Sequence, residues 1–215
     1  MGQQPGLAWE RDLLAQGYAL IAGLDEAGRG AWAGPVVAAA VILPLYRPDL
    51  EQVLAPVRDS KLLSPHQREE CYELIVRCAL GYGVGMVPAV EIDRLGIVPA
   101  TRLAMRQALS ALTLSPDYLL IDGLGLPRLP LPQRAIPKGD RTCLSIAAAS
   151  ILAKVTRDHW MIALEERLPG YGLAAHKGYG TRQHKAALEK LGPTAYHRHT
   201  FAPIRLLDGM SDGRS

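Results

Sequence analysis

Residues 19–43 of this 215-residue chain read ALIAGLDEAGRGAWAGPVVAAAVIL, and this stretch decides the fold class. An apolar run, Ala19–Leu24, ends on the adjacent acids Asp25 and Glu26. A loop containing glycine follows, and then a second apolar run, Val36–Leu43, which contains several β-branched residues. Because β-branched and apolar runs of this length favour strands, the stretch predicts two buried β-strands joined by the loop.

Working outward, strand and helix patterns alternate along the chain. Further strands are predicted over Tyr82–Val87, Tyr118–Ile121 and Gln133–Pro137. Helices are predicted after a capping box that begins at Ser64, around the apolar spacing at 105–112, and from 145 to 168. This order predicts an α/β fold with a mixed central β-sheet flanked by helices and a C-terminal helical segment.

No repeat or linker divides the chain, and its 48% hydrophobic and 21% charged residues are typical of a globular protein. We therefore expect an N-terminal lead-in over residues 1–18, one domain over 19–204 and a flexible tail over 205–215. The longest apolar run is far shorter than the ~20 residues of a membrane-spanning helix, and the N-terminus lacks a signal-peptide pattern. With only three cysteines, the chain is not expected to have a disulfide framework. We expect a cytoplasmic protein without a membrane segment, and we expect it to be a monomer.

Charge is distributed unevenly between the two parts of the chain. Residues 1–133 carry 11 Lys and Arg against 14 Asp and Glu, whereas residues 134–215 carry 13 against 7. An acidic part joined to a basic part suits a polyanion that is bound through metal ions and cationic side chains. Taken alone, the asymmetry is better explained by ordinary variation in surface charge, so the function is inferred from the sequence motifs.

Acidic residues close three of the predicted strands: Asp25 with Glu26, Asp122 and Asp140. Asp122 precedes a glycine and could be a turn residue, and Asp140 could be a loop acid. If the four carboxylates converge, divalent cations would offset their repulsion, and oxygen ligands favour Mg²⁺ or Mn²⁺ over zinc. Two such ions are suited to phosphodiester hydrolysis.

Two features complicate a metal site. Successive side chains on a strand point to opposite faces, so either the strand kinks between Asp25 and Glu26, or Glu26 contributes its backbone carbonyl. The histidines at 197 and 199 have the spacing of zinc ligands, but no other Cys or His pair in the sequence has such a spacing, and we expect these two at the surface.

The motifs extend across the chain in a fixed order. They are GLDEAGRG at 23–30, AGPVVAAAV at 33–41, DSK at 59–61, IDG at 121–123, KGD at 138–140, SIAAASILAKVTRD at 145–158 and HKGYGT at 176–181. Together they resemble the ribonuclease HII family over residues 19–204. Ala31 and Trp32 depart from the pattern, since the family often has Pro or Cys and then Leu there.

The resemblance implies a ribonuclease H-like fold and a metal-dependent endonuclease with two Mn²⁺ or Mg²⁺ ions. Such an enzyme hydrolyses the phosphodiester 5′ of a ribonucleotide, in RNA–DNA hybrids and in duplex DNA containing single ribonucleotides. It leaves a 3′-hydroxyl and a 5′-phosphate, and it serves to remove ribonucleotides from DNA. Its partner is nucleic acid.

The resemblance also implies roles for individual residues. Asp25, Glu26, Asp122 and Asp140 match the metal-binding and catalytic acids. Gly28, Arg29 and Gly30 match the motif that recognises the 2′-hydroxyl and the adjacent phosphates. Tyr179 matches the tyrosine that packs on the next sugar. Lys61 and Lys138 match lysines that bind phosphate, although less closely. Asp158 is expected to form a structural ion pair with Arg157, and His176 and His184 are expected to lie in a solvated basic loop.

Three alternatives remain. A general RNA–DNA hybrid nuclease of the ribonuclease HIII type would share the fold, but the Gly28–Gly30 motif argues against it. A non-catalytic hybrid-binding module is disfavoured by four intact acids. A dinucleotide-binding enzyme is disfavoured because the glycines do not fit G-x-G-x-x-G.

Overall fold

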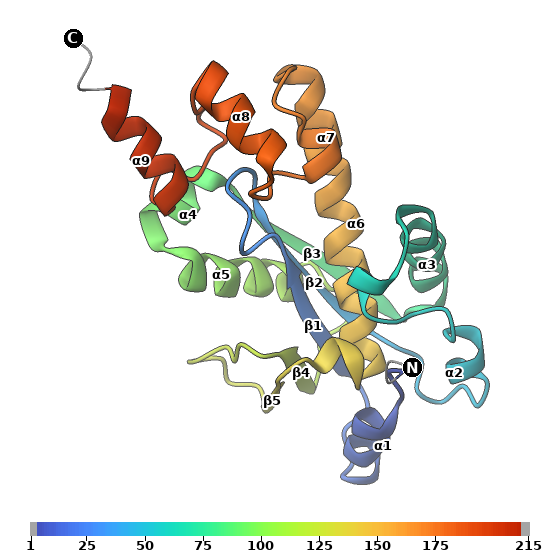
Figure 1. The fold of residues 1–215 in the computed structure, drawn as a ribbon. Coiled ribbons are helices and arrows are strands. Elements are labelled where there is room, and N and C mark those ends of the chain that lie inside the picture. Colours follow the sequence, from blue (N-terminus) through green and yellow to red (C-terminus); the bar gives the residue numbers. More distant parts are fainter. Residues whose placement is uncertain (1–3, 212–215) are drawn as a thin grey trace.

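The computed structural model describes residues 4–211 of the chain. Its centre is a five-stranded sheet with the order β3-β2-β1-β4-β5 (Figure 1). The strands are β1 (Ile21–Ala27), β2 (Val36–Ile42), β3 (Gly81–Val87), β4 (Tyr118–Asp122) and β5 (Gln133–Ile136). Neighbours β1, β2 and β3 are antiparallel, whereas β4 is parallel to both β1 and β5. The prediction of a mixed sheet is confirmed.

Helices and short 3₁₀ turns precede, connect and follow these strands. They are α1 (Ala8–Ala15), α2 (Leu50–Val53), η1 (Ser60–Leu62), α3 (Pro65–Cys78), α4 (Ala89–Leu95), α5 (Ile97–Ser110), η2 (Gly139–Arg141), α6 (Leu144–Arg167), α7 (Leu173–His176), α8 (Arg182–Leu191) and α9 (Ala202–Ser211). Ser64 caps α3 with the predicted capping box, in which the Ser64 side chain accepts from the Gln67 backbone and the Gln67 side-chain oxygen accepts from the Ser64 backbone.

Helices cover both faces of the sheet (Figure 1). Alternate residues of β1 and β2, such as Ala27 and Val37, pack with α6, and their neighbours, such as Leu24 and Val36, pack with α5. The glycines of β3 allow α5 to approach closely, because a Cβ on Gly85 would lie 2.0 Å from the Ala104 carbonyl oxygen. This two-sided burial explains why β1 and β2 are almost uniformly apolar.

Both ends of the described chain are structured. Helix α1 lies within the expected lead-in, and its buried Glu10 accepts a 2.8 Å hydrogen bond from the Ser145 backbone at the start of α6. Helices α7, α8 and α9 gather at the opposite end of the molecule (Figure 1). Helix α9 crosses the boundary expected at 204, so the backbone remains helical to Ser211. The rest of the expected tail, 212–215, lies outside the described residues.

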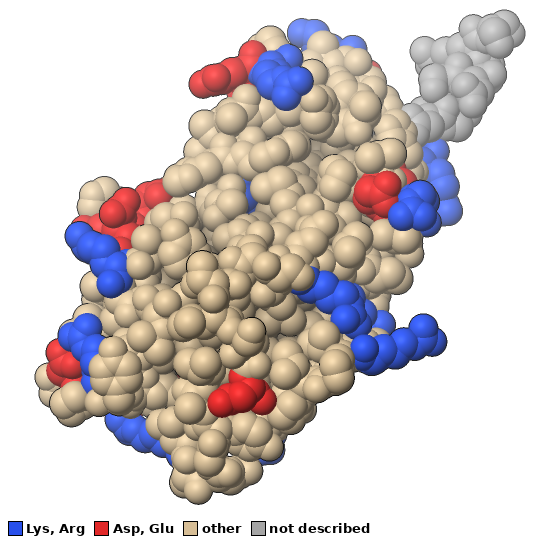
Figure 2. All heavy atoms as spheres, turned by 180° about the vertical axis from the view of Figure 1, so that it is seen from behind, with Lys and Arg blue, Asp and Glu red and all other residues tan. Residues whose placement is uncertain are grey.

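The surface of the described residues gives two further observations. None of the helices in residues 4–211 is both long and apolar enough to cross a membrane. Figure 2 shows the face behind the view of Figure 1, where acidic and basic side chains are scattered and lie largely near the outline. On this face the charges do not gather into one large basic area of the kind that binds a polyanion.

Candidate active site

A pocket of about 280 Å³ opens where β1 and β4 end, between the sheet and α6. Its lining combines acids, glycines, cations and one tyrosine. The lining residues are Asp25, Glu26, Ala27, Gly28, Arg29, Gly30, Ser60, Lys61, Asp122, Ser150, Lys154 and Tyr179. Eight of the ten site residues expected from the sequence are therefore at this pocket, and Asp140 and Lys138 are not among its lining residues.

The strand register explains how two distant acids meet. Strands β1 and β4 are parallel, and Leu24 pairs with Ile121, which places the following residues, Asp25 and Asp122, side by side at the carboxyl ends. This is the edge at which ligands bind in α/β sheets. Asp122 also accepts a 2.7 Å hydrogen bond from the Gly139 backbone, which fixes the neighbouring turn η2 against the end of β4.

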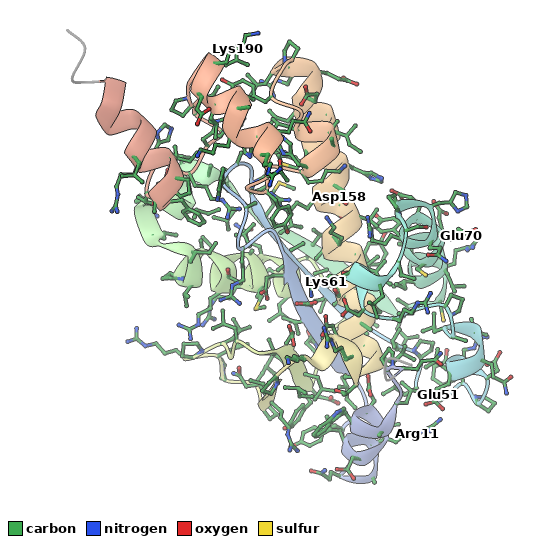
Figure 3. All side chains as sticks on the ribbon, in the orientation of Figure 1. Arg11, Glu51, Lys61, Glu70, Asp158 and Lys190 are labelled. Carbon is green, nitrogen blue, oxygen red and sulfur yellow. The ribbon has the colours of Figure 1, made fainter. Side chains whose placement is uncertain are left out.

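Asp140 is buried within that turn, immediately beside the pocket. Its Oδ2 atom lies 3.3 Å from Nζ of Lys61, a residue that does line the pocket (Figure 3). Its negative charge also raises the pKa of Asp122. The structure thus brings Asp140 close to the other acids, whereas Lys138 is exposed at the start of the turn.

Strand β1 pairs with Ala38 and Ala39 of β2 through both acids and ends at Ala27, directly after them. The pairing is regular, so the kink that was one of the two alternatives between Asp25 and Glu26 is absent. Asp25 lies on the face toward α6, between Gly23 and Ala27. Alternation directs Glu26 to the other face, where its Oε1 atom is 3.1 Å from Arg29.

Burial and mutual repulsion disfavour the charged forms of these acids. The pKa of Asp25 is raised well above its ordinary value by burial and then by the charges of Glu26 and Asp122. Burial also raises the pKa of Glu26, although Arg29 opposes the shift. Burial is likewise the main cause of the raised pKa of Asp122. A bound cation would relieve this repulsion.

The donor atoms fit a hard divalent ion that keeps part of its hydration. Among the described residues, no three or more acidic, histidine or cysteine side chains are arranged so that they alone could hold a metal ion. Mg²⁺ typically uses only one or two carboxylates together with water and substrate phosphates. The Oε2 atom of Glu26 is buried and lacks a hydrogen-bond partner within the described chain. That oxygen is available to a ligand.

The ribonuclease HII family model matches residues 22–204 of the chain. The chain belongs to this family. It is 55% identical over 202 residues to the ribonuclease HII of Dehalococcoides mccartyi, covering 94% of each chain, and 57% identical over 203 residues to that of Chloroflexus aurantiacus, covering 93% of this chain and 94% of the relative.

A solved structure agrees with this membership. The ribonuclease H2 of Pyrococcus horikoshii OT3 superposes with a TM-score of 0.76 at 26% identity, covering 89% of this chain and 98% of that one. The predicted ribonuclease H-like fold is confirmed. As a member of the ribonuclease HII family, the chain is a ribonuclease H endonuclease, an enzyme class that acts on RNA–DNA hybrids.

Besides Ala27, three polar residues line the pocket that were not predicted as site residues from the sequence of this ribonuclease HII family member. The hydroxyl oxygens of Ser60 and Ser150 lie 3.0 Å apart, and Ser150 also lowers the pKa of Asp25, against the larger effect of burial. Lys154 is one helical turn further along α6 than Ser150. Their spacing of four residues places both on one helix face, and this signal was present in the sequence.

Asp158 forms the expected structural ion pair, but with Lys154 and not with Arg157. Asp158 accepts a 2.7 Å hydrogen bond from Lys154, because residues four apart on α6 share a face and adjacent residues do not (Figure 3). Arg157 points the other way and donates to backbone carbonyls, including that of Lys177.

Two histidine predictions are also wrong. His184 and His197 are fully buried, not solvated, and their Nε2 atoms lie 3.2 Å apart. His184 lies on the inner face of α8, and its Nδ1 atom is 3.0 Å from the Tyr179 carbonyl oxygen. Burial lowers the pKa of His184 to about 4, so this ring is neutral near pH 7. It supports the loop under Tyr179 and does not face phosphate.

Proposed function

We propose that this endonuclease cleaves 5′ of a ribonucleotide, both in RNA–DNA hybrids and in duplex DNA containing a single ribonucleotide. The products would be a 3′-hydroxyl and a 5′-phosphate, and the reaction would begin the removal of ribonucleotides from DNA by a cytoplasmic monomer. One observation carries the proposal: paired acids, the Gly28–Gly30 motif and Tyr179 line the same pocket.

In this proposal, Asp25, Glu26, Asp122 and Asp140 hold two Mn²⁺ or Mg²⁺ ions. When bound, such ions polarise the phosphate and lower the pKa of a water molecule for attack. The carboxylates position the ions at the edge where β1 and β4 end. The hydrogen bond from Gly139 keeps Asp122 oriented toward this edge while leaving its second carboxylate oxygen for a ligand.

The glycine motif is suited to reading a ribose. Gly28 and Gly30 both line the pocket without side chains that would keep a sugar at a distance. A ribose could therefore approach the backbone closely enough for a hydrogen bond with its 2′-hydroxyl, the group that distinguishes RNA from DNA. Arg29, which is partly exposed beside Glu26, can move to meet the adjacent phosphate.

Tyr179 and two lysines complete the proposed substrate site. The flat Tyr179 ring would pack on the sugar that follows the ribonucleotide, where a deoxyribose fits and an added hydroxyl would crowd the ring. The preferred site is then an RNA-to-DNA junction. Lys61, which is 74% exposed, and the exposed Lys138 would contact phosphates on the surface beside the pocket.

The experiment is cleavage of a duplex with one embedded ribonucleotide, with each divalent ion added in turn. We expect a single cut 5′ of the ribonucleotide in Mn²⁺ or Mg²⁺ and no cut in chelator. The ends are identified by ligation and by phosphatase treatment. Equal cleavage of this duplex and of a uniform RNA–DNA hybrid, without junction preference, would favour a general hybrid nuclease of the ribonuclease HIII type.

A further inference from the structure

Two loops that carry the proposed substrate contacts form one bonded unit. The glycine loop comprises residues 28–35, and the tyrosine loop comprises residues 176–180. The backbone nitrogen of Trp32 donates a 2.8 Å hydrogen bond to the carbonyl oxygen of Gly178. The Trp32 ring lies flush on Gly180, where a Cβ would be 2.2 Å from the indole. A movement of one loop would therefore move the other.

Arg157 of α6 holds these loops together from the interior. Its Nη2 atom donates to the Ala33 carbonyl at 3.0 Å and its Nε atom to the Pro35 carbonyl at 2.9 Å, both in the glycine loop. Its Nη1 atom donates to the Lys177 carbonyl at 2.9 Å, in the tyrosine loop. One rigid, planar guanidinium thus fixes three carbonyls that belong to two loops.

The same guanidinium also contacts the two groups that are proposed to recognise the substrate sugars, the Gly28 backbone and the Tyr179 ring. A Cβ on Gly28 would lie 2.0 Å from the Nε atom of Arg157, so the arginine packs directly on the Gly28 backbone. Its Cζ atom lies 5.3 Å from the centre of the Tyr179 ring. Arg157 is fully buried, which is costly for a cation, and its hydrogen bonds offset that cost.

A second buried arginine secures the other side of the glycine loop. Arg198 donates to the carbonyls of Gly28 at 2.7 Å, Arg29 at 2.8 Å and Gly34 at 3.0 Å. Arg198 holds the glycine loop only, whereas Arg157 joins it to the tyrosine loop. The two loops are also joined by the backbone bond from Trp32 to Gly178, but Arg157 is the side chain that contacts both the Gly28 backbone and the Tyr179 ring.

We propose that Arg157 is a positioning residue that sets the preference for an RNA-to-DNA junction. This inference rests on the proposed function, in which Gly28 and Tyr179 read two successive sugars. Those sugars have a fixed spacing along the strand, so both are read only if the two loops keep a matching separation. On a uniform RNA strand the second sugar does not fit Tyr179, so a change in the separation of the loops lowers kcat/KM less on this substrate.

The test is Arg157→Lys, which keeps the charge but cannot reach three carbonyls at once. The kcat and KM are measured on a duplex with one ribonucleotide and on a uniform RNA–DNA hybrid of equal length. We expect the ratio of the two kcat/KM values to fall about tenfold, because misplacement by about 1 Å can cost up to a hundredfold in rate. The loss should lie in kcat on the junction substrate.

Two controls separate positioning from general destabilisation. Met105→Ala removes a buried side chain from α5 on the opposite face of the sheet, so it should leave the ratio unchanged. Trp32→Leu, which introduces the residue common in the family, removes the indole from Gly180 and should lower the ratio less than Arg157→Lys does. In a Tyr179→Ala background, Arg157→Lys should lower the ratio no further.

The outcomes distinguish this inference from the proposed function. A parent enzyme without junction preference contradicts the proposed function itself. If the parent enzyme prefers the junction and folded Arg157→Lys keeps that preference, the inference about Arg157 is overturned and the proposed function stands. An equal loss of kcat/KM on both substrates has the same consequence. If Arg157→Lys does not fold, an unchanged ratio in Trp32→Leu also overturns it, and a lowered ratio supports it.

Discussion

The Nζ atom of Lys61 lies 3.3 Å from Oδ2 of Asp140 and 3.9 Å from Oδ1 of Asp59. Both acids are buried, whereas 74% of the lysine side chain is exposed. The ammonium group therefore compensates the acidic cluster from its solvent side, with an attraction that water screens. A divalent ion at the same carboxylates would be repelled by it.

This relationship predicts the effect of Lys61→Met on metal binding. We expect Mn²⁺ to bind about two- to fivefold more tightly, because an exposed ion pair contributes roughly 0.2–1 kcal/mol. Calorimetric titration of the nuclease without nucleic acid measures this affinity. Lys190→Met is the control, since Lys190 is exposed on α8 and far from Lys61 (Figure 3). Unchanged or weaker binding in Lys61→Met would contradict the prediction.

Removal of one negative charge should abolish cleavage and stabilise the metal-free fold. Asp122→Asn retains an oxygen that can accept from Gly139, but it ends the repulsion that raises the pKa of Asp25. We expect the melting temperature in chelator to rise by about 2–4 °C, the change that about 1 kcal/mol produces in a chain of this size. Asp12→Asn, at an exposed acid of α1, should change neither property. Parent-like cleavage by Asp122→Asn would refute the metal-site proposal.

The local patterns of the sequence were enough to predict the sheet and the acids at its edge. Each of these features depends on nearby residues, such as the apolar run before Asp25 or the strand that ends at Asp122. Strand β1 ends at Ala27, directly after the two acids that were predicted to close it. Alternation and capping are likewise properties of a few successive residues.

The features that the sequence did not predict depend on contacts between distant segments. Arg157 is 124 residues from Ala33, and Arg198 is 170 residues from Gly28. The sequence shows only two cations in a basic region, with no periodicity that reveals their carbonyl partners. His184 also contacts His197, 13 residues further along the chain, and no periodicity in the sequence indicates this contact. Such contacts follow from tertiary packing alone.

The buried His184 predicts a specific loss of stability in acid. Its pKa is about 4 in the fold and about 6.5 in the unfolded chain, so the unfolded state binds the proton more readily between these values. Stability is therefore lost as the pH falls from 6.5 toward 4, by up to about 3 kcal/mol. The raised pKa values of Asp25 and Asp122 act in the opposite direction, since protonation relieves their repulsion.

Urea unfolding at pH 7 and pH 5 measures this effect as a difference between variants. The free energy of unfolding should fall less on acidification in His184→Gln than in the parent chain, because the variant lacks the group that takes up the proton. His66→Gln, at an exposed histidine of α3, should behave like the parent. The same pH dependence in His184→Gln and the parent would show that His184 does not carry the effect.

Tyr179→Ala should separate binding from cleavage. The ring lies at the pocket and beside the guanidinium of Arg157. Under the proposed function, its removal leaves the cations proposed to bind phosphate in place but frees the sugar that follows the ribonucleotide. We expect kcat on a single-ribonucleotide duplex to fall about 10- to 100-fold, since rate depends steeply on orientation, while the duplex Kd changes little. Tyr179→Phe keeps the flat ring and should retain most of the activity. If Tyr179→Ala weakened binding as much as it slowed cleavage, the ring would act as an anchor for the duplex and not as a guide for the scissile bond.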